Sequence, residues 1–409
     1  MNSMRFTALS AALMAATALS HPAFADSKVT VSGWDDLGKM MTDVINPQLA
    51  AAQIVAEYNA VQGDFQKFLL NGLSSDTAPD LFYVDINWAY PVFASGKVAE
   101  LPEAEFAAIL DAMPDALKAA FYQDGKLYGV AKDYATLTIA YNRDLFEDAG
   151  VDVPSDDDTW ETLGAKLQAI SDTMGDGFYG TCLPAGYDRF GAVAFAHGWT
   201  PFDDAGKTTL DANFAAALTF WKGLKDSGAG AVPADIGMDW TGGCLASEKV
   251  AIAIEGAWIN GFLRDNAPAM EYGSAMMPKG PGGQRGNFIY TVAWSLKANA
   301  ADPAAGIATI KALVSPESQT FRLENYGAIP IDMDLSNFPF LDAEGKANDF
   351  LRKSIAGAQD GVVIPFSGGK NGGAWMEVIN SVISDVMVNN TPVEEAISKG
   401  QAKLDALPL

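Results

Sequence analysis

The sequence predicts an α/β protein made of two lobes with a ligand cleft between them. Strand-like apolar runs alternate with helical patterns along most of the chain. About 380 residues follow the N-terminal leader, which is long for a single core and ordinary for two. No flexible linker separates two halves, so we expect the chain to pass between the lobes several times, as in hinged proteins that close around a ligand.

The elements are predicted from periodicity and turn residues. We expect strands at residues 28–33, 79–84, 178–182, 250–255 and 288–296, and helices at residues 40–60, 88–95, 189–198, 213–227, 303–314, 316–325, 347–358, 373–388 and 392–406. Strands alternating with helices imply parallel sheets. Gly96 is a candidate helix C-cap. Thr391 is a candidate N-cap for the last helix, whose first turn holds Glu394 and Glu395.

The first 25 residues have the features of a secretory signal peptide. Arg5 precedes an apolar run, and Ala23 and Ala25 form an A-x-A cleavage site. We expect cleavage after Ala25 and release into the periplasm. No cysteine lies near this site, so we expect no lipid anchor.

Charge and histidine content exclude several classes of function. The chain has 27 basic and 51 acidic residues, a balance that disfavours nucleic acid as a partner. Only His197 remains after the signal peptide is removed, so a histidine-rich metal site is impossible. We therefore expect neither a metal nor a cofactor.

Two cysteines, Cys182 and Cys244, remain in the exported chain. In an oxidising compartment they could form one disulfide. Two buried thiols are the alternative, because the sequence cannot supply the distance between them.

The most informative segment runs from Asp124 to Leu163 and reads DGKLYGVAKDYATLTIAYNRDLFEDAGVDVPSDDDTWETL. It resembles the domain-crossing strand of the extracellular solute-binding proteins that serve ABC sugar importers. Four further segments match that family in the right order: VTVSGWDD, APDLFYVDINWAYPVFASGKVAEL, CLASEKVAIAIEGAWINGFL, and the stretch from GGQRGNFIYTVAWSL to TPVEEAI. The resemblance covers nearly the whole chain after the leader.

The resemblance implies the periplasmic-binding-protein fold, with chain crossings near Lys132, Thr291 and Asn337. One lobe would comprise residues 26–131 and 292–338, and the other residues 132–291 and 339–409. It also implies a monomeric binding protein, not an enzyme, that holds a sugar, sugar derivative or polyol and docks on an ABC permease in the inner membrane.

Candidate ligand-binding residues are aromatic and polar side chains that follow predicted strands, where open α/β sheets bind ligands. The resemblance adds weight to Asn87 and Trp88, to Trp258 as a stacking residue, and to Trp375, which matches a stacking position in maltodextrin-binding relatives. Trp34 could instead plug the core of its lobe. The full set is Trp34, Asp35, Asp36, Asn87, Trp88, Asp133, Tyr187, Asp188, Arg189, Trp240, Glu255, Trp258, Asn287, Tyr326 and Trp375. Trp160, Trp199 and Trp221 are predicted to be core residues.

Two alternatives remain open from the sequence. A polysaccharide hydrolase or lyase would use a pair of carboxylates, such as Asp35 and Asp133, although no spacing singles out an acid and a nucleophile. The same fold could also bind a non-sugar solute, such as a polyamine, an iron chelate or an anionic sugar derivative. An anionic ligand would need an inward cation from Lys132, Arg189, Arg285 or Arg322.

Overall fold

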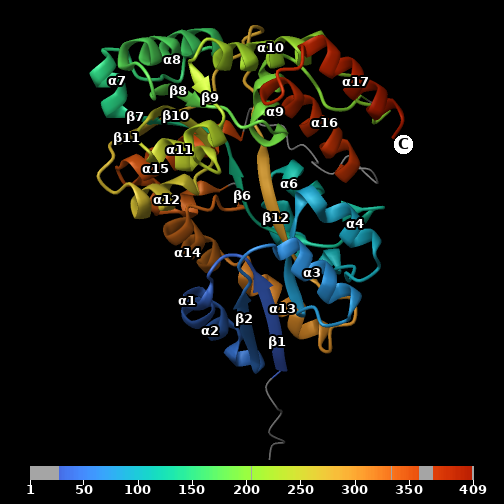
Figure 1. Ribbon diagram of the computed structural model, residues 1–409. Coiled ribbons are helices and arrows are strands. Elements are labelled where there is room, and N and C mark those ends of the chain that lie inside the picture. Colours follow the sequence, from blue (N-terminus) through green and yellow to red (C-terminus); the bar gives the residue numbers. More distant parts are fainter. Residues whose placement is uncertain (1–26, 204, 333, 359–371, 408–409) are drawn as a thin grey trace, which may run out of the picture.

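The computed structural model describes residues 27–407 apart from residues 204, 333 and 359–371. The predicted signal peptide and its cleavage site lie outside these residues. The chain forms two α/β lobes, one above the other in Figure 1, each built on a five-stranded sheet. The predicted fold class is confirmed.

The first sheet lies in the lower lobe of Figure 1. Its strand order is β2 (Ile54–Ala60), β1 (Ser27–Gly33), β3 (Leu81–Asp85), β12 (Ile289–Leu296) and β6 (Val130–Thr136). β1 runs parallel to β2 and β3, whereas β12 runs antiparallel to β3 and β6. The C-terminal ends of β1 and β3 therefore lie at the same edge of the sheet.

The second sheet lies in the upper lobe. Its order is β11 (Tyr272–Ala275), β7 (Thr138–Asn142), β10 (Val250–Glu255), β8 (Tyr179–Cys182) and β9 (Gly230–Ala231). β8 is parallel to β9 and β10, and β7 is antiparallel to β10 and β11. The prediction of parallel sheets is therefore only partly right, because β7 and β12 run against their neighbours.

A predicted helix over residues 40–60 is wrong in its second half. The helical segment ends before Gln53, which adopts a left-handed conformation with φ of 55°. Residues from Ile54 onward form β2, in which buried Ile54 and Ala56 alternate with exposed Val55 and Glu57. That period of two marks a strand with one buried face, and the pairing with β1 satisfies its backbone.

The helices follow the strands closely. Those linked to the first sheet are α1 (Gly38–Met40), η1 (Met41–Ile45), α2 (Asn46–Leu49), η2 (Ala50–Ala52), α3 (Phe65–Ser74), η3 (Ile86–Trp88), α4 (Ala89–Ala94), α5 (Glu103–Asp111), α6 (Asp115–Ala119), α13 (Pro303–Leu313) and α14 (Pro316–Tyr326). Those linked to the second sheet are α7 (Arg143–Ala149), α8 (Trp160–Met174), α9 (Tyr187–Ala196), α10 (Ala212–Asp226), η4 (Pro233–Ile236), α11 (Thr241–Ala246), α12 (Ile259–Asn266), α15 (Lys346–Gly357), α16 (Gly372–Met387) and α17 (Val393–Asp405). In the described part of the chain, no helix combines the length and the apolar character needed to span a bilayer.

The structure shows the local geometry of one hairpin turn and of one helix N-cap. Asp124 and Gly125 form the turn that joins β4 (Tyr122–Gln123) to β5 (Lys126–Leu127), and both residues have positive φ, as a tight hairpin requires. The predicted N-cap of α17 is wrong. Its N-cap is Pro392, without a side-chain cap, because Thr391 lies one residue too early.

The first passage between the sheets occurs at Leu137. β6 stays paired with β12 as far as Thr136, and β7 begins in the second sheet at Thr138. This point lies beyond Lys132, where the crossing was expected. The side chain of Thr136 also donates a hydrogen bond to the carbonyl of Ser354 in α15.

The chain re-enters the lower lobe at Phe288 and leaves it again after Ile329. Phe288 packs its ring against Tyr187 and Phe195 of the upper lobe, and the next residue, Ile289, already pairs in the first sheet. Later, Ile329 forms a bridge with Tyr134, after which η5 (Leu335–Asn337) and η6 (Pro339–Asp342) lead to α15 beside β7 and β11.

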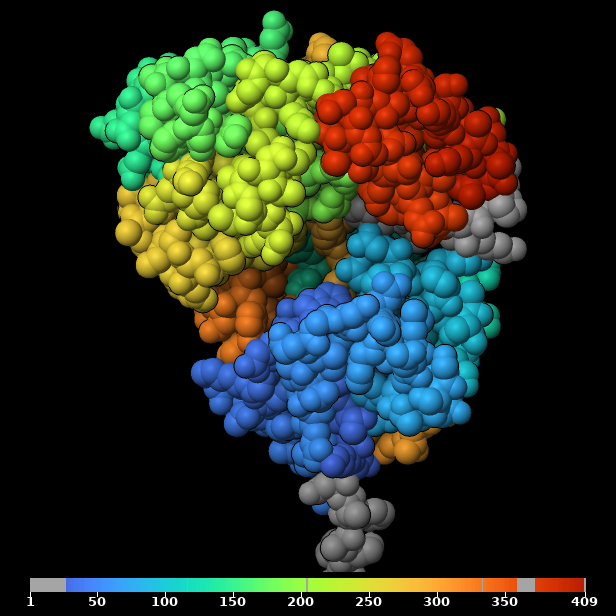
Figure 2. Space-filling view, in the orientation of Figure 1, coloured from blue at the N-terminus to red at the C-terminus, as the bar shows by residue number. Residues whose placement is uncertain are grey.

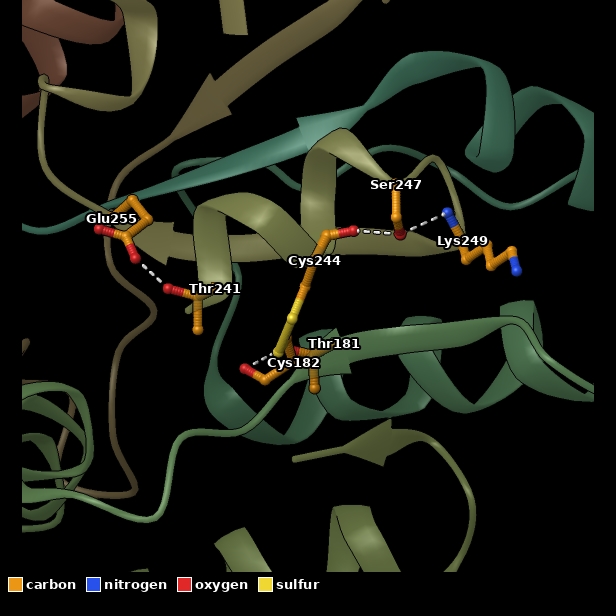
Figure 3. The surroundings of a disulfide bond; sticks show 7 residues. All are labelled: Thr181, Cys182, Thr241, Cys244, Ser247, Lys249 and Glu255. Atoms are coloured by element: carbon orange, nitrogen blue, oxygen red, sulfur yellow. Dashed lines mark hydrogen bonds between the residues drawn. A yellow bond between two sulfur atoms is a disulfide. The ribbon is translucent and has the colours of Figure 1, made fainter. Parts of the chain in front are cut away.

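A disulfide joins Cys182 at the end of β8 to Cys244 in α11, with the Cα atoms 6.3 Å apart (Figure 3). Both cysteines are fully buried in a small cluster with Val250. The bond fixes α11 against the second sheet. The same helix carries Thr241, whose hydroxyl donates to the carboxylate of Glu255.

Candidate ligand-binding cleft

A cavity of about 330 Å³ opens between the two sheets, and Figure 2 shows the molecule hollowed between its blue N-terminal residues and its yellow-green residues. Its floor is the edge of the first sheet where β1 and β3 end, the position at which open α/β sheets bind ligands. The cavity is lined by Trp34, Asp35, Asp85, Lys132, Asp133, Tyr134, Ala135, Trp258, Tyr290, Thr291, Val292, Arg322, Tyr326, Gly327 and Ala328.

A buried cluster of two cations and two carboxylates supports this floor. Arg322 Nε donates to Asp133 Oδ2 at 3.1 Å, and its Nη2 lies 3.3 Å from Asp35 Oδ2. Lys132 Nζ lies 2.7 Å from Asp133 Oδ2 and 3.6 Å from Asp35 Oδ2. Burial alone would raise the pKa of Asp35, but Lys132 and Arg322 hold it below its ordinary value. The two positive and two negative charges of this cluster therefore cancel.

On the first-sheet side, the aromatic surface is Trp34. Its ring packs edge-on against Tyr83 at 4.8 Å and Phe65 at 5.4 Å between centroids. A Cβ at Gly33 would come within 2.4 Å of the Tyr83 ring, so the close approach of Tyr83 requires glycine there. Trp34 is partly exposed, so its packing against the core still leaves surface for a ligand.

On the second-sheet side, the aromatic surface is Trp258. Its indole nitrogen donates to Glu255 Oε2 at 2.8 Å, and the same oxygen accepts from Arg189 Nη2 at 2.7 Å. Glu255 is fully buried, so the carboxylate orients the indole rather than contacting solvent. Gly256 leaves room for the ring, because a Cβ there would lie 2.2 Å from it.

Arg189 acts behind the cleft rather than in it. Its Nε donates to the carbonyl of Ile254 at 2.9 Å, and its Nη1 bonds to the backbone of Asp188 and to Tyr290. The guanidinium carbon lies 5.7 Å from the centre of the Trp258 ring. Its donors are thus directed at protein groups, which fixes both aromatic rings.

A second, more open cavity of about 1000 Å³ adjoins the first. Tyr290 lines both cavities. The other residues that line the second cavity are Gln66, Asn87, Trp88, Pro91, Pro184, Ala185, Gly186, Asp188, Gly372, Gly373, Met376, Glu377, Asn380, Ser381 and Ser384. The cleft is therefore long enough to extend from β3 to α16, which contacts η3.

The structure places the predicted residues in four different positions relative to the cavities. The structure brings Trp34, Asp35, Asp133, Trp258 and Tyr326 together in the first cavity and Asn87, Trp88 and Asp188 in the second. Arg189 and Glu255 support the wall behind Trp258. Asp36, Tyr187, Trp240, Asn287 and Trp375 line neither cavity.

Three of the aromatic and acidic candidates outside the cavities have structural roles. Tyr187 is fully buried among Phe288, Trp375 and neighbouring rings. Trp375 is 3% exposed, and its indole nitrogen donates to Thr208 Oγ1 at 2.7 Å. Asp36 accepts a backbone hydrogen bond from Gly38 at 3.1 Å. Residues at helix starts belong either to the core or to the cleft. The residue type alone therefore does not tell a core position from a cleft position.

Trp240 is a different case, because it is partly exposed. Its ring packs edge-on against Phe262 at 4.7 Å, and it lies at the N-cap of α11. Sequence reasoning also missed Tyr290 and Asp85. Asp85 directly follows a buried strand and could have been found by the same rule that selected Asn87, whereas Tyr290 depends on the antiparallel placement of β12. The predicted core positions of Trp160, Trp199 and Trp221 are confirmed.

Asn287 links the chain passage at Leu137 to the passage at Phe288 in the hinge. Its Oδ1 accepts from the N–H groups of Leu137 and Phe288, each at 2.8 Å, and its Nδ2 donates to the carbonyl of Leu137 at 2.9 Å. The side chain is 1% exposed. It therefore satisfies the backbone of the residue at which the chain changes sheets.

We expect Asn287→Ala to lower the free energy of unfolding by about 2 kcal/mol, because it leaves buried backbone groups of Leu137 without partners. Urea titration followed by tryptophan fluorescence measures the change. Asn389→Ala, at an exposed asparagine, is the matched control and should stay within about 0.5 kcal/mol of the parent. Equal stability of both variants would show that the hinge hydrogen bonds contribute nothing.

Solved structures with the same architecture include ABC substrate-binding proteins. One from Listeria monocytogenes, in complex with cycloalternan, aligns with a TM-score of 0.81 at 19% identity and covers 93% of this chain and 98% of that chain. The GacH receptor of Streptomyces glaucescens, solved unliganded and with acarbose and an acarbose homolog, aligns with a TM-score of 0.79 at 21% identity, over 94% and 100%. The fold is that of the two-lobed substrate-binding proteins.

Residues 50–347 match the bacterial extracellular solute-binding protein family, and the chain belongs to that family. A binding protein of Brucella abortus (strain 2308) is 23% identical over 278 residues, which is 65% of this chain. The alignment spans 66% of that relative's length, just under two thirds. The resemblance is confirmed for the family and for the fold.

Proposed function

We propose that the protein is the periplasmic substrate-binding component of an ABC importer and that it binds a sugar, sugar derivative or polyol in the cleft. The observation that carries the proposal is that Trp34 and Trp258, from different sheets, line one cavity together with carboxylates. Indole faces pack on the C–H-rich faces of sugar rings, while charged groups form strong hydrogen bonds with hydroxyls. The ligands in the two compared structures point in the same direction.

Closure around the ligand follows from this placement. A solute that contacts Trp34 on one side and Trp258 on the other interacts with both lobes at once, so it favours the closed arrangement by its differential affinity. The two sheets would form the cores of the moving lobes, with Leu137 and Phe288 in the hinge. The closed form of the monomer would then dock on the membrane permease.

Export is part of the proposal. The leader that ends at Ala25 would direct the chain to the periplasm and be removed there, leaving a protein without a lipid anchor. The net charge of −24 suits a protein that does not bind nucleic acid. The family consists of binding proteins, and no enzymatic step is assigned to this chain.

A thermal-shift screen of residues 26–409 tests the function. We expect a mono-, di- or oligosaccharide or a polyol to raise the unfolding temperature, because a ligand at 100 times its dissociation constant stabilises by about 2.7 kcal/mol. Reducing ends are assayed in the same samples as a control for hydrolysis. The proposal fails if no carbohydrate or polyol shifts the transition, or if the hits are turned over.

A further inference from the structure

The carboxylate of Asp85 is distinct from the other acidic groups that line the first cavity. It stands at the last position of β3, and its Oδ1 accepts the N–H of Asn87 at 2.9 Å. In the first sheet, Asp85 pairs with Val292, which in turn pairs with Asp133, so it lies in register with the cleft floor. Among the described residues, which are 27–358 without 204 and 333 and then 372–407, no ion pair involves Asp85.

The neighbouring cations are already engaged. Arg322 is 2% exposed and bonds to Asp133, Asp35 and Tyr83. Lys132 is bonded to Asp133 and lies 4.8 Å from the centre of the Tyr83 ring. Two cations and two carboxylates balance, so Asp85 adds one uncompensated negative charge to the floor.

The second cavity increases this imbalance. Asp188 and Glu377 line it, while no lysine or arginine does so among the residues that the structure describes. Asp188 is paired with Arg189, and Glu377 is exposed. A charge distribution of this sign opposes an anionic ligand and favours a cationic one.

The aromatic rings around Asp85 suit the same ligand. Trp34, Trp258 and Tyr290 line the cavity with it. Indole and phenol faces attract cations through their quadrupoles, and the attraction grows when the cation is removed from water. A cavity that a carboxylate and three aromatic residues line together can therefore hold an ammonium group.

We propose that the ligand carries a protonated amine and that Asp85 pairs with it, which makes an amino sugar the preferred solute class. The proposal rests on the proposed function as a sugar-binding protein. It assigns the rings to the sugar faces and Asp85 to the nitrogen.

Burial raises the pKa of Asp85 from its ordinary value to about 6, with Asn87 and Lys132 opposing the rise. The other charged groups that line the same cavity are Lys132, Asp133, Asp35 and Arg322. An ammonium ligand favours ionised Asp85, so its affinity is full above about pH 6 and falls as the pH drops through that value. Pairing with an ammonium group would stabilise the charge of a carboxylate that burial shields from water.

The test uses matched sugar pairs in titration calorimetry at pH 7: glucosamine with glucose, and chitosan disaccharide with cellobiose. We expect the amine-bearing member of a pair to bind at least about tenfold more tightly. Asp85→Asn should abolish the preference for the amine-bearing sugar at pH 7. In this variant, lowering the pH to 5 should therefore cause no further loss of preference. Glu317→Gln, at an exposed glutamate of α14 that lines neither cavity, is the matched control and should keep both the preference and its loss at pH 5.

The variant should fold, because asparagine can still accept the N–H of Asn87 and relieves a buried charge; circular dichroism and the unliganded unfolding temperature check this. If glucose and cellobiose bind as tightly as their amine partners, the inference is overturned while the proposed function stands. If Asp85→Asn keeps the preference, or if Glu317→Gln also removes it, the assignment to Asp85 is wrong. If only putrescine or spermidine binds, and through Asp85, the cation inference holds and the sugar proposal falls.

Discussion

Arg322→Met is expected to lower the free energy of unfolding by about 3–5 kcal/mol, the range typical of breaking a buried ion pair from one side. Methionine fills much of the space but leaves Asp133 and the partly buried Asp35 with Lys132 as their only cation among the residues that the structure describes. Tyr83 also loses its contact with Arg322 Nη1, which lies 3.3 Å from the phenol oxygen. Chemical denaturation with two probes, fluorescence and circular dichroism, measures the loss.

A matched control removes a cation of an exposed pair. Lys311 bonds to Glu105 on the surface, where such pairs contribute about 0–1 kcal/mol, so Lys311→Met should change little. Adding Asp133→Asn to Arg322→Met should recover part of the stability, because one stranded charge is removed. Similar losses in the Arg322 and Lys311 variants would show that the cluster is not a buried electrostatic unit.

Trp258→Ala is expected to weaken binding of the solute found in the thermal-shift screen at least about 100-fold, or about 2.7 kcal/mol. The change removes the ring that the second sheet presents to the ligand, and it also removes the donor to Glu255. Trp258→Phe keeps a ring without the indole N–H and should give an intermediate affinity. Titration calorimetry measures all three proteins.

Trp240→Ala provides the matched control. This indole lies in the same lobe and is partly exposed, but it packs against Phe262 and lines neither described cavity. Its loss should leave the affinity unchanged. If Trp240→Ala weakens binding and Trp258→Ala does not, the ligand lies elsewhere in the upper lobe.

Much of the secondary structure follows from local patterns. β10 coincides with the predicted residues 250–255, and α13 to α16 differ from prediction only at their ends. The failure at β2 has a local cause, because alanine-rich residues 50–52 continue the helical pattern up to Gln53. Only the left-handed turn at Gln53 and the pairing with β1 decide against a longer helix.

The site is harder to predict because aromatic residues serve cores and ligands alike. Trp258 and Trp375 both stand near helix starts, yet Trp258 lines the cleft and Trp375 reaches Thr208 inside the lobe. What separates them is the packing of α16 on α9 and α10, which no local pattern contains. The sequence predicts Asn287 as a ligand contact, but its side chain bonds to the backbone of Leu137, 150 positions away.

The position of β12 has a consequence for how the protein acquires its structure. This strand lies between β3 and β6, yet it is made more than 150 residues after β6. Until it arrives, β3 and β6 each have an open edge, and the N-terminal half cannot complete its core. Closing so long a loop is slow. The chain should therefore remain without its final structure until most of it has been synthesised, a state in which chaperones can hold it.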